Sequence, residues 1–270
     1  MSTVTVLAAT GKTGRRVVRA LTQAGHEVRA ASRSSASRFD WGDDSTWPSA
    51  LARADAVYVV ADESEHQLDR LERFVALAGD HGVGRLVLLS ARQWNEFPHA
   101  LWERYLTRET IVRAGSVPWV ILRPVWFFQN FTEEPHLADG LAAGEVTHGF
   151  GAGRHPFIDA EDIAAVAATA LTDDGHAGQI YELSGPEAVT AAEVVAALGA
   201  ASGQRIAARG LSSEDYAEFS QQFFGEDAAE LVALMDLIRE GKDARLSDGV
   251  AQVLGRPPRS VAQFAATAAM

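Results

Sequence analysis

The part of this chain that most constrains its fold is the N-terminal segment TVTVLAATGKTGRRVV, residues 3–18. A run of β-forming residues leads into a turn of small residues. The turn opens a segment with apolar residues at helical spacing, Val17, Val18 and Leu21, which ends near Gly25. A strand, a glycine turn and a helix in this order build a dinucleotide site, because backbone N–H groups of the turn approach the pyrophosphate at the positive end of the helix. The segment therefore predicts a cofactor site at the start of the chain.

The glycine spacing of this turn is A-x-x-G-x-x-G, in which Ala8 stands where the usual fingerprint has its first glycine. An alanine is tolerated there if its backbone φ is negative, because a Cβ atom disfavours the left-handed region. We therefore expect a negative φ at Ala8. The residues of the turn that we predict to contact the cofactor are Ala8, Thr10, Gly11, Lys12, Thr13 and Gly14.

The end of the second predicted strand, residues 27–33, indicates which cofactor is bound. Enzymes for NAD usually carry Asp or Glu there for the ribose hydroxyls, whereas enzymes for NADP place Arg nearby for the 2′-phosphate. This strand ends in Ser32 and Arg33, and the next acidic residue is Asp40. A guanidinium beside hydroxyl groups suits a phosphate dianion; the alternative is that Arg33 is a solvated turn residue. We predict that Ser32 and Arg33 bind the cofactor and that NADP(H) is preferred over NAD(H).

The composition excludes several classes of protein. The 270-residue chain has a net charge of −12 and a pI near 5.1, which argues against nonspecific binding to nucleic acid or to anionic membranes. It contains no cysteine, which excludes disulfides, thiolate metal sites and cysteine nucleophiles. No histidine or carboxylate spacing is typical of a metal site, so we predict no metal.

The N-terminal segment does not match a signal peptide, and no apolar run is long enough to span a bilayer. We therefore expect a cytoplasmic protein that binds a small-molecule substrate but neither nucleic acid nor membrane. The sequence leaves open whether it is a monomer or a homodimer.

Apolar strands alternate with helices through the first half of the chain. Beyond the first two, strands are predicted at 57–60, 85–90 and 119–122, and another at 179–183. Such a pattern indicates a parallel sheet covered on both faces, and right-handed crossovers then give an α/β, doubly wound sheet of the Rossmann type. Further cofactor contacts are expected where these strands end, at Val60, Ala61, Ser90 and Pro124.

We predict two domains. Residues 1–132 and 155–184 form the NADP(H)-binding Rossmann domain, and residues 133–154 and 185–270 form a smaller, mainly helical domain that binds the substrate. The ligand is expected between the two, beyond the carboxyl ends of the strands. The spacing of Thr190 and Glu193 matches a capping box and predicts a helix start in the smaller domain.

Several segments together resemble a known family. They are TVTVLAATGKTGRRVV, RFDWGDDSTWPSAL, VLLS, WVILRPVWFFQNF, HPFIDAEDIA, YELSGPEAVT and GRPPRSVAQF. In this order, over nearly the whole length, they are similar to the NmrA-like family of atypical short-chain dehydrogenases, and the DW and RPPRS segments are similar to its ergot-alkaloid-type reductases. The resemblance implies NAD(P)H-dependent reduction of a C=N, C=C or C=O bond in a small molecule.

The chain departs from ordinary short-chain dehydrogenases at their Tyr-x-x-x-Lys pair. Counting back from Arg123, the Tyr position falls on Leu101 and the Lys position on Tyr105. The Tyr105 phenol, with a reference pKa of about 10, lies beside the nicotinamide ribose or is a structural tyrosine half-buried against the sheet. Ser90 takes the place of the family's serine after the fourth strand. Ser90 and Tyr105 are therefore the candidate catalytic residues.

Aromatic residues gather after the strand that ends at Pro124, where ligands of this fold enter. Such residues with a single amide suit a flat, apolar substrate. The predicted pocket residues are Trp94, Trp126, Phe127 and Asn130.

Four other residues are candidates for chemistry but have simpler interpretations. His99 and His148 stand in predicted loops and are either general acids or solvated side chains, and the latter is favoured. Asp159 and Asp162 are interpreted as residues that cap and charge the start of a helix.

Three functions remain open from the sequence. The leading hypothesis is an NADPH-dependent reductase of an apolar, aromatic or polycyclic substrate, which works without the Tyr/Lys pair because a pre-polarised iminium needs no proton donor. The alternative is a non-catalytic NADP(H)-binding redox sensor, as some NmrA-like proteins are. A non-redox isomerase or cyclase ranks below both.

Overall fold

The computed structural model describes residues 1–64, 66–92, 100–225 and 228–268, with no account of the side chains at 100–102. It divides into two compact units. The first comprises Met1–Pro124, Ala160–Leu183 and Gly249–Arg256, and the second comprises Val125–Asp159, Ser184–Asp248 and Pro257–Met270. Each unit is described below by itself.

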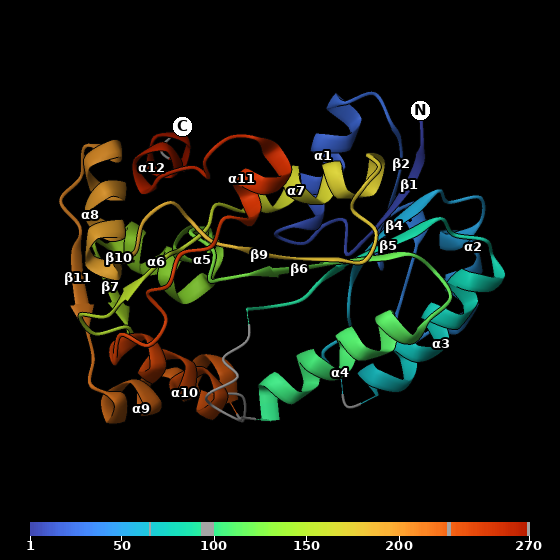
Figure 1. Cartoon of the computed structure of the whole chain (residues 1–270). Coiled ribbons are helices and arrows are strands. Elements are labelled where there is room, and N and C mark those ends of the chain that lie inside the picture. Colours follow the sequence, from blue (N-terminus) through green and yellow to red (C-terminus); the bar gives the residue numbers. More distant parts are fainter. Residues whose placement is uncertain (65, 93–99, 226–227, 269–270) are drawn as a thin grey trace. The chain divides into compact units, whose positions relative to one another are not determined.

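The first unit is built on a seven-stranded parallel sheet (Figure 1), which confirms the predicted fold class. Its strand order is β3-β2-β1-β4-β5-β6-β9, so the order reverses next to β1. The strands are β1 (Thr3–Leu7), β2 (Glu27–Ser32), β3 (Ser37–Arg38), β4 (Ala56–Val60), β5 (Arg85–Leu89), β6 (Trp119–Pro124) and β9 (Gln179–Leu183). The carboxyl ends of β1 and β4 lie side by side at this reversal, where doubly wound folds bind ligands.

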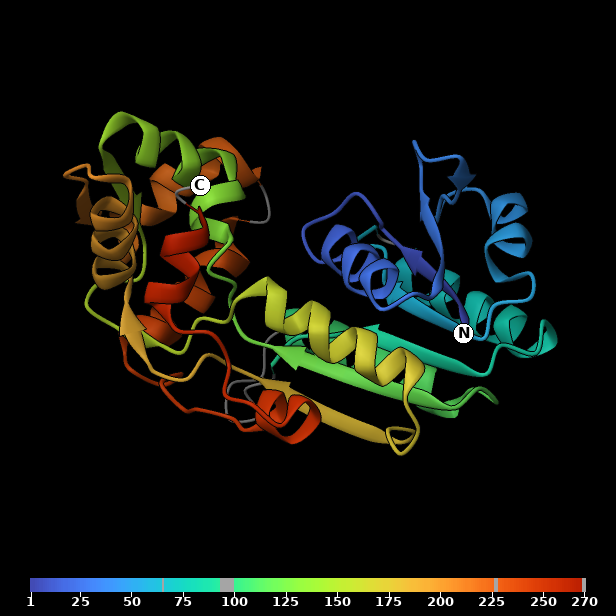
Figure 2. The same cartoon turned by 90° about the horizontal axis from the view of Figure 1, so that it is seen from above.

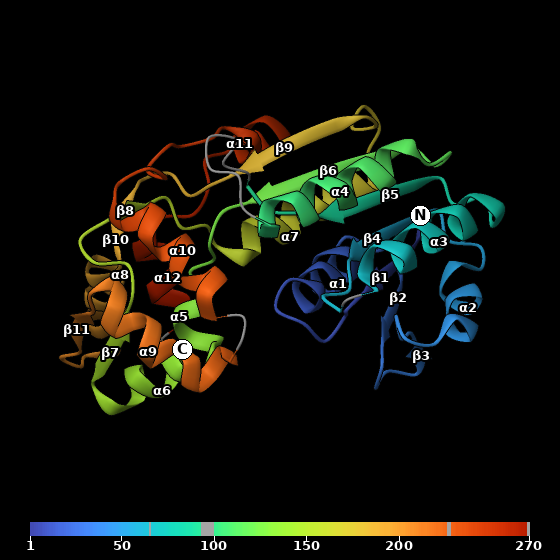
Figure 3. The same ribbon diagram turned by 90° about the horizontal axis from the view of Figure 1, so that it is seen from below.

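Helices cover both faces of this sheet. α1 (Gly14–Gln23), α7 (Ala160–Thr172) and α11 (Gly249–Leu254) pack together on one face, as Figure 2 shows for α1 and α7. α2 (Trp47–Leu51), which follows the 3₁₀ turn η1 (Asp44–Thr46), lies with α3 (Gln67–Asp80) and α4 (Ala100–Ala114) on the other (Figure 3). Because both faces are covered, the central strands are mainly apolar, and Val4, Val6, Val57 and Val59 are fully buried.

The second unit is mainly helical. Its helices are α5 (Asn130–Glu133), α6 (Pro135–Ala143), α8 (Ala191–Ser202), α9 (Ser213–Phe224), α10 (Ala228–Arg239) and α12 (Val261–Ala268). Its strands form two pairs: β7 (Glu145–His148) with β11 (Ala207–Gly210), and β8 (Arg154–His155) with β10 (Val189–Thr190). The predicted capping box is present at the start of α8, where Thr190 and Glu193 bond to each other's backbone N–H.

The two units differ from the predicted domains mainly at three places: residues 125–132 and 155–159 belong to the helical unit instead of the sheet unit, and the short helix α11 belongs to the sheet unit. α11 falls within the range 185–270 that we predicted as the smaller domain, yet it groups with the sheet because it packs against α7 and β9. Gly249 permits this approach, since a Cβ atom there would stand 2.3 Å from the carbonyl oxygen of Glu182.

Candidate functional site

The glycine turn between β1 and α1 folds tightly enough to require its glycines. A Cβ atom on Gly14 would stand 2.1 Å from the carbonyl oxygen of Ala8, and one on Gly11 would stand 3.1 Å from the same atom. Gly14 thus lets the first turn of α1 pack directly against the end of β1. Thr13 is the N-cap residue of α1, but its side chain makes no capping hydrogen bond, and the first turn holds no acidic residue. The turn therefore suits an anion at this helix end.

Our expectation for Ala8 was wrong. Its φ is +51°, in the left-handed region, not negative. The conformation lets the Ala8 carbonyl accept the Gly11 backbone N–H at 2.8 Å while the Ala9 N–H bonds to Ala31 of β2 at 3.1 Å. The turn geometry that the first glycine serves is therefore kept by an alanine under backbone strain.

A pocket of about 540 Å³ opens beside this turn, at the carboxyl ends of β1, β2 and β4. Seven of the predicted cofactor residues line it: Ala8, Thr10, Gly11, Ser32, Arg33, Val60 and Ala61. Eight further residues line it that sequence reasoning did not single out: Ser34, Phe39, Asp40, Trp41, Gly42, Asp62, Glu63 and Arg70. Lys12, Thr13, Gly14, Ser90 and Pro124 are not among its lining residues, although Gly14 shapes the turn.

The aromatic part of this wall comes from the DW segment after β3. The Trp41 ring meets Phe39 edge-on at 5.0 Å and Phe74 of α3 at 5.1 Å between centroids. Its indole Nε1 donates to the carbonyl oxygen of Val60 at 3.0 Å. These contacts hold Trp41 at the end of β4, so the aromatic spacing of the segment was a usable signal for this wall.

Two of the three acidic side chains of the pocket form ion pairs, and the third, Asp40, accepts the Gly42 backbone N–H at 2.9 Å. Asp62 pairs with Arg70 at 2.5 Å, and although burial raises the pKa of its carboxyl, hydrogen bonds from Ser64 and Arg70 outweigh that effect and lower the pKa overall. Glu63 pairs with Arg108 of α4 at 2.8 Å. By contrast, Arg33 is exposed at the end of β2 and makes no hydrogen bond or ion pair within the described ranges of the chain.

Ser90 lies directly after β5 and is held by a buried acid. Its hydroxyl donates to Oε1 of Glu109 at 2.6 Å, and Glu109 receives both Nε (2.9 Å) and Nη2 (2.5 Å) of Arg123. Glu109 is only 2% exposed. Because the Ser90 hydroxyl already donates its proton to this carboxylate, its oxygen can act only as a hydrogen-bond acceptor toward a ligand. Glu109 could not be identified from the sequence, because it lies on helix α4, 19 residues from Ser90 along the chain.

Tyr105 is half-buried on α4 with its ring 4.9 Å from the guanidinium carbon of Arg108. Burial and the nearby charge of Glu63 raise the pKa of the phenol, and Arg108 and Arg104 only partly offset this. The phenol is thus a weaker acid than in water. The side chain of Leu101, at the usual Tyr position, lies outside the described part.

A second cavity, of about 240 Å³, lies within the helical unit. Of the predicted substrate residues, Trp126 and Asn130 line it and Phe127 does not, while Trp94 lies outside the described residues. The Trp126 backbone N–H is held at 3.2 Å by Nε2 of His155, whose Nδ1 faces Asp243 at 2.8 Å. The other lining residues, which the sequence did not reveal, are Glu134, His136, Leu137, His148, Phe150, Tyr216, Phe224 and Leu231.

His148, for which the sequence favoured a solvated loop residue, is the last residue of β7 and only 2% exposed. The solvated interpretation was therefore wrong. Burial, and to a smaller extent the charge of Arg239, lowers the pKa of the imidazole to about 4. It is therefore neutral at physiological pH. His99, the other candidate general acid, lies outside the described residues.

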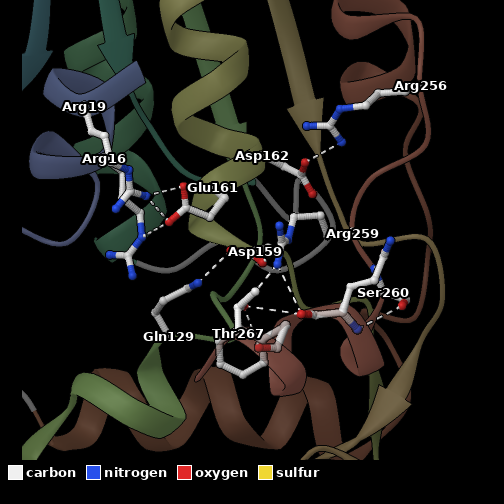
Figure 4. A network of polar contacts seen from close by, with 12 residues as sticks. Arg16, Arg19, Gln129, Asp159, Glu161, Asp162, Arg256, Arg259, Ser260 and Thr267 are labelled. Atoms are coloured by element: carbon white, nitrogen blue, oxygen red, sulfur yellow. Dashed lines mark hydrogen bonds and ion pairs between the residues drawn. The ribbon is translucent and has the colours of Figure 1, made fainter. Parts of the chain in front are cut away.

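The two aspartates at the start of α7, which we interpreted from the sequence as helix caps, form ion pairs with arginines of the RPPRS segment (Figure 4). Asp159 pairs with Nε of Arg259 at 2.7 Å and Asp162 with Nη1 of Arg256 at 2.8 Å, and both carboxylates are fully buried. Asp159 also accepts from Gln129 at 2.6 Å. These side chains therefore have a structural role.

Among the described residues, no helix combines the length and the apolar character needed to cross a membrane. In the same ranges, no three His, Asp or Glu side chains are grouped so that they could hold a metal ion.

Comparison with known proteins agrees with this geometry. The model of a family described as NAD(P)H-binding matches residues 8–174. The chain is 31% identical to festuclavine dehydrogenase of Aspergillus fumigatus, over 97% of this chain and 96% of that one. It is 30% identical to an NAD(P)H azoreductase of Xenophilus azovorans, over 97% and 96% of the two chains.

Solved structures show the same fold. An NADPH-dependent quinone oxidoreductase of Escherichia coli, solved with NADPH, superimposes with a TM-score of 0.80 at 22% identity, over 98% of this chain and 99% of that chain.

Proposed function

Because the chain belongs to the NAD(P)H-binding family, in its NmrA-like branch of atypical short-chain reductases, we propose that it uses NADPH to reduce a small, ring-containing apolar substrate. That it is an NAD(P)H-dependent oxidoreductase follows from the family and from relatives of nearly full length. The proposal adds the preferred cofactor, the substrate pocket and the way in which a proton is supplied.

The residues of the larger pocket fit a dinucleotide phosphate. The approach of Gly14 to Ala8 packs the first turn of α1 against the end of β1, where a helix N-terminus favours an anion, and 540 Å³ is within the roughly 300–1,000 Å³ of ligand sites. When bound there, NADPH would supply the hydride. The chain's own residues would bind and orient it: the glycine turn for the pyrophosphate, Val60 and Ala61 for its apolar surface.

The observation that carries the preference for NADP(H) is the state of Arg33. It is exposed in the pocket, has no partner in the described part of the chain, and stands beside Ser32 and Ser34. The acids Asp62 and Glu63 are engaged by Arg70 and Arg108, so Arg33 is available for a phosphate dianion.

The cavity of the helical unit is proposed as the substrate pocket, with Trp126 and Asn130 in its wall. One relative is named for festuclavine and another as an azoreductase, and a fold neighbour is named for quinones. Their names favour a ring-containing substrate with a reducible double bond, such as C=N, C=C or C=O.

Neither Tyr105 nor Ser90 is a poised proton donor. The pKa of Tyr105 is raised rather than lowered, and the Ser90 hydroxyl already donates to Glu109. We therefore propose that the proton comes from solvent or is not needed, as with an iminium. The non-catalytic sensor has no observation in its favour beyond the missing Tyr/Lys pair.

The test is consumption of NADPH, followed by its absorbance, with a panel of cyclic iminium ions, enones and quinones. At least one class should be turned over, and Tyr105→Phe should change kcat less than about threefold, because a general acid is worth about 10²- to 10⁴-fold. Thr107→Ala, a change at an exposed position of the same helix, serves as a control. A hundredfold loss of kcat in Tyr105→Phe would make Tyr105 the proton donor, and turnover of no class would refute the function.

A further inference from the structure

The smaller cavity has mostly apolar walls, but two buried polar side chains in its lining have no hydrogen-bond partner among the described residues. Trp126, Phe150 and Leu137 supply part of its apolar surface, and Trp126 meets Phe150 edge-on at 5.4 Å between ring centroids. The two polar groups are the imidazole of His148 on β7 and the phenol of Tyr216 on α9. Buried polar groups normally have partners, so both need an explanation.

The Nδ1 atom of His148 is buried and has no hydrogen-bond partner within the described ranges. The side chain as a whole is 2% exposed. The neighbouring Arg239 does not supply the missing bond, because its Nη1 and Nη2 donate to the carbonyl oxygens of Leu211 (2.6 Å) and Gly149 (2.5 Å). Its charge instead helps burial to keep the imidazole neutral, with one nitrogen a donor and the other an acceptor.

The hydroxyl of Tyr216 likewise has no hydrogen-bond partner in the part of the chain that the structure describes. Tyr216 is 4% exposed, and burial raises the pKa of its phenol to about 12, so it stays protonated and able to donate. Its ring lies on Gly149, where a Cβ atom would stand 2.4 Å from ring carbon Cδ1. The absence of a side chain at Gly149 thus leaves room for this ring in the wall of the cavity that His148 also lines.

We propose that His148 and Tyr216 determine substrate specificity by donating hydrogen bonds to a ketone-type oxygen on a small ring ligand. The inference rests on the proposed function, since it names the substrate class of the same pocket. At about 240 Å³ the cavity lies below the roughly 300–1,000 Å³ range of sites for drug-sized ligands, which favours one or two fused rings over a larger polycycle. A neutral imidazole and a neutral phenol suit an uncharged oxygen acceptor, and the Glu134 carboxylate in the same wall disfavours an anion.

The experiment compares two probes that differ in one oxygen, 1-tetralone and tetralin, by calorimetric titration of the full chain without cofactor. We expect wild type to bind 1-tetralone about tenfold more tightly than tetralin, because a net hydrogen bond is worth a factor of about two to ten. His148→Phe should abolish this preference while leaving tetralin affinity within twofold, and Tyr216→Phe should reduce it. His148→Gln, which keeps a hydrogen-bonding group, should restore part of it.

Tyr181→Phe is the matched control, since it removes a phenol oxygen from β9, outside this cavity, and should leave the preference unchanged. Circular dichroism establishes that each variant is folded, and Tyr216→Phe, which removes one oxygen atom, keeps the test decisive if His148→Phe does not fold. Equal binding of the two probes by wild type, binding of neither, or a preference that survives both the His148→Phe and Tyr216→Phe variants would overturn the inference. Because no NADPH is present, these outcomes are independent of whether the chain is a reductase.

Discussion

Ala8 adopts a left-handed backbone, with φ of +51°, although it carries a Cβ atom. Such a conformation costs a non-glycine residue about 1 kcal/mol or more, and the glycine turn imposes it because the Ala8 carbonyl must face Gly11 and Gly14. We therefore expect Ala8→Gly to raise the free energy of unfolding by about 1 kcal/mol, net of the added freedom of the unfolded chain. Urea denaturation followed by circular dichroism measures this, and a loss of stability would show that the turn is unstrained at Ala8.

His148 offers a second test at the scale of one residue. Its pKa is about 4 in the folded chain and about 6.5 when unfolded, so the unfolded state binds the extra proton between these values. Stability from this group is complete above pH 6.5 and is lost as the pH falls toward 4, by up to roughly 3 kcal/mol. His148→Gln should lack this pH dependence, so the stability difference between the two proteins should change across that window. A constant difference would mean that His148 titrates normally.

Residues of the cofactor turn could be predicted because their signal is local. Gly11, Gly14 and Arg33 are identified by spacing within one strand–turn–helix unit, and the strain at Ala8 was missed because a sequence does not show which way a turn closes. His148 and Tyr216 are 68 positions apart, and Ser90 and Glu109 lie on different elements. His148 and Tyr216 come to line one cavity, and Ser90 and Glu109 come within hydrogen-bond distance, only in the folded chain.

At the scale of elements, helix α7 begins with two buried carboxylates and a half-exposed one between them (Figure 4). Asp162 is fully buried against Arg256, whereas Glu161 is 34% exposed and pairs with Arg16 and Arg19. Water screens the charged hydrogen bond at the fully buried Asp162 carboxylate only weakly, although Arg256 is 45% exposed, whereas it screens the half-exposed Glu161 carboxylate more strongly.

We expect Asp162→Asn to lower the free energy of unfolding by about 2 kcal/mol and Glu161→Gln by about 1 kcal/mol or less. The two changes are matched, since each replaces a carboxylate by an amide in the same helical turn. Urea denaturation in 0.5 M salt should widen the contrast, because salt screens the exposed pair more strongly. Equal losses in the two variants would contradict the assignment.

The regular elements of the sheet were predictable because each buried strand is a continuous apolar run. β3, which is two residues long within a serine-rich segment, has no periodicity to recognise, and β10 and β11 are too short or too exposed to be separated from the helices beside them. The RPPRS segment was visible as a motif, but its role as the partner of the buried aspartates was not.

For the chain as a whole, the α/β doubly wound fold was predicted correctly, because six of the seven parallel strands and their helices leave a strong, repeated pattern. The division of the chain was harder to anticipate, since α11 joins the sheet unit from far along the chain through contacts with α7 and β9. The position of α11 depends on tertiary packing around Gly249, which no local sequence pattern predicts.

Whether Arg33 binds the 2′-phosphate of NADP(H) can be tested with nicotinamide fluorescence. The quantity to measure is the ratio of NADH to NADPH dissociation constants for wild type, Arg33→Ala and Arg38→Ala. Arg38 is the matched control, an exposed arginine on β3 that pairs with Asp43 and does not line the pocket. We predict that wild type binds NADPH at least tenfold more tightly than NADH, that Arg33→Ala removes this preference by weakening NADPH alone, and that Arg38→Ala keeps it. Equal affinities in wild type, or a ratio unchanged by Arg33→Ala, would contradict the account.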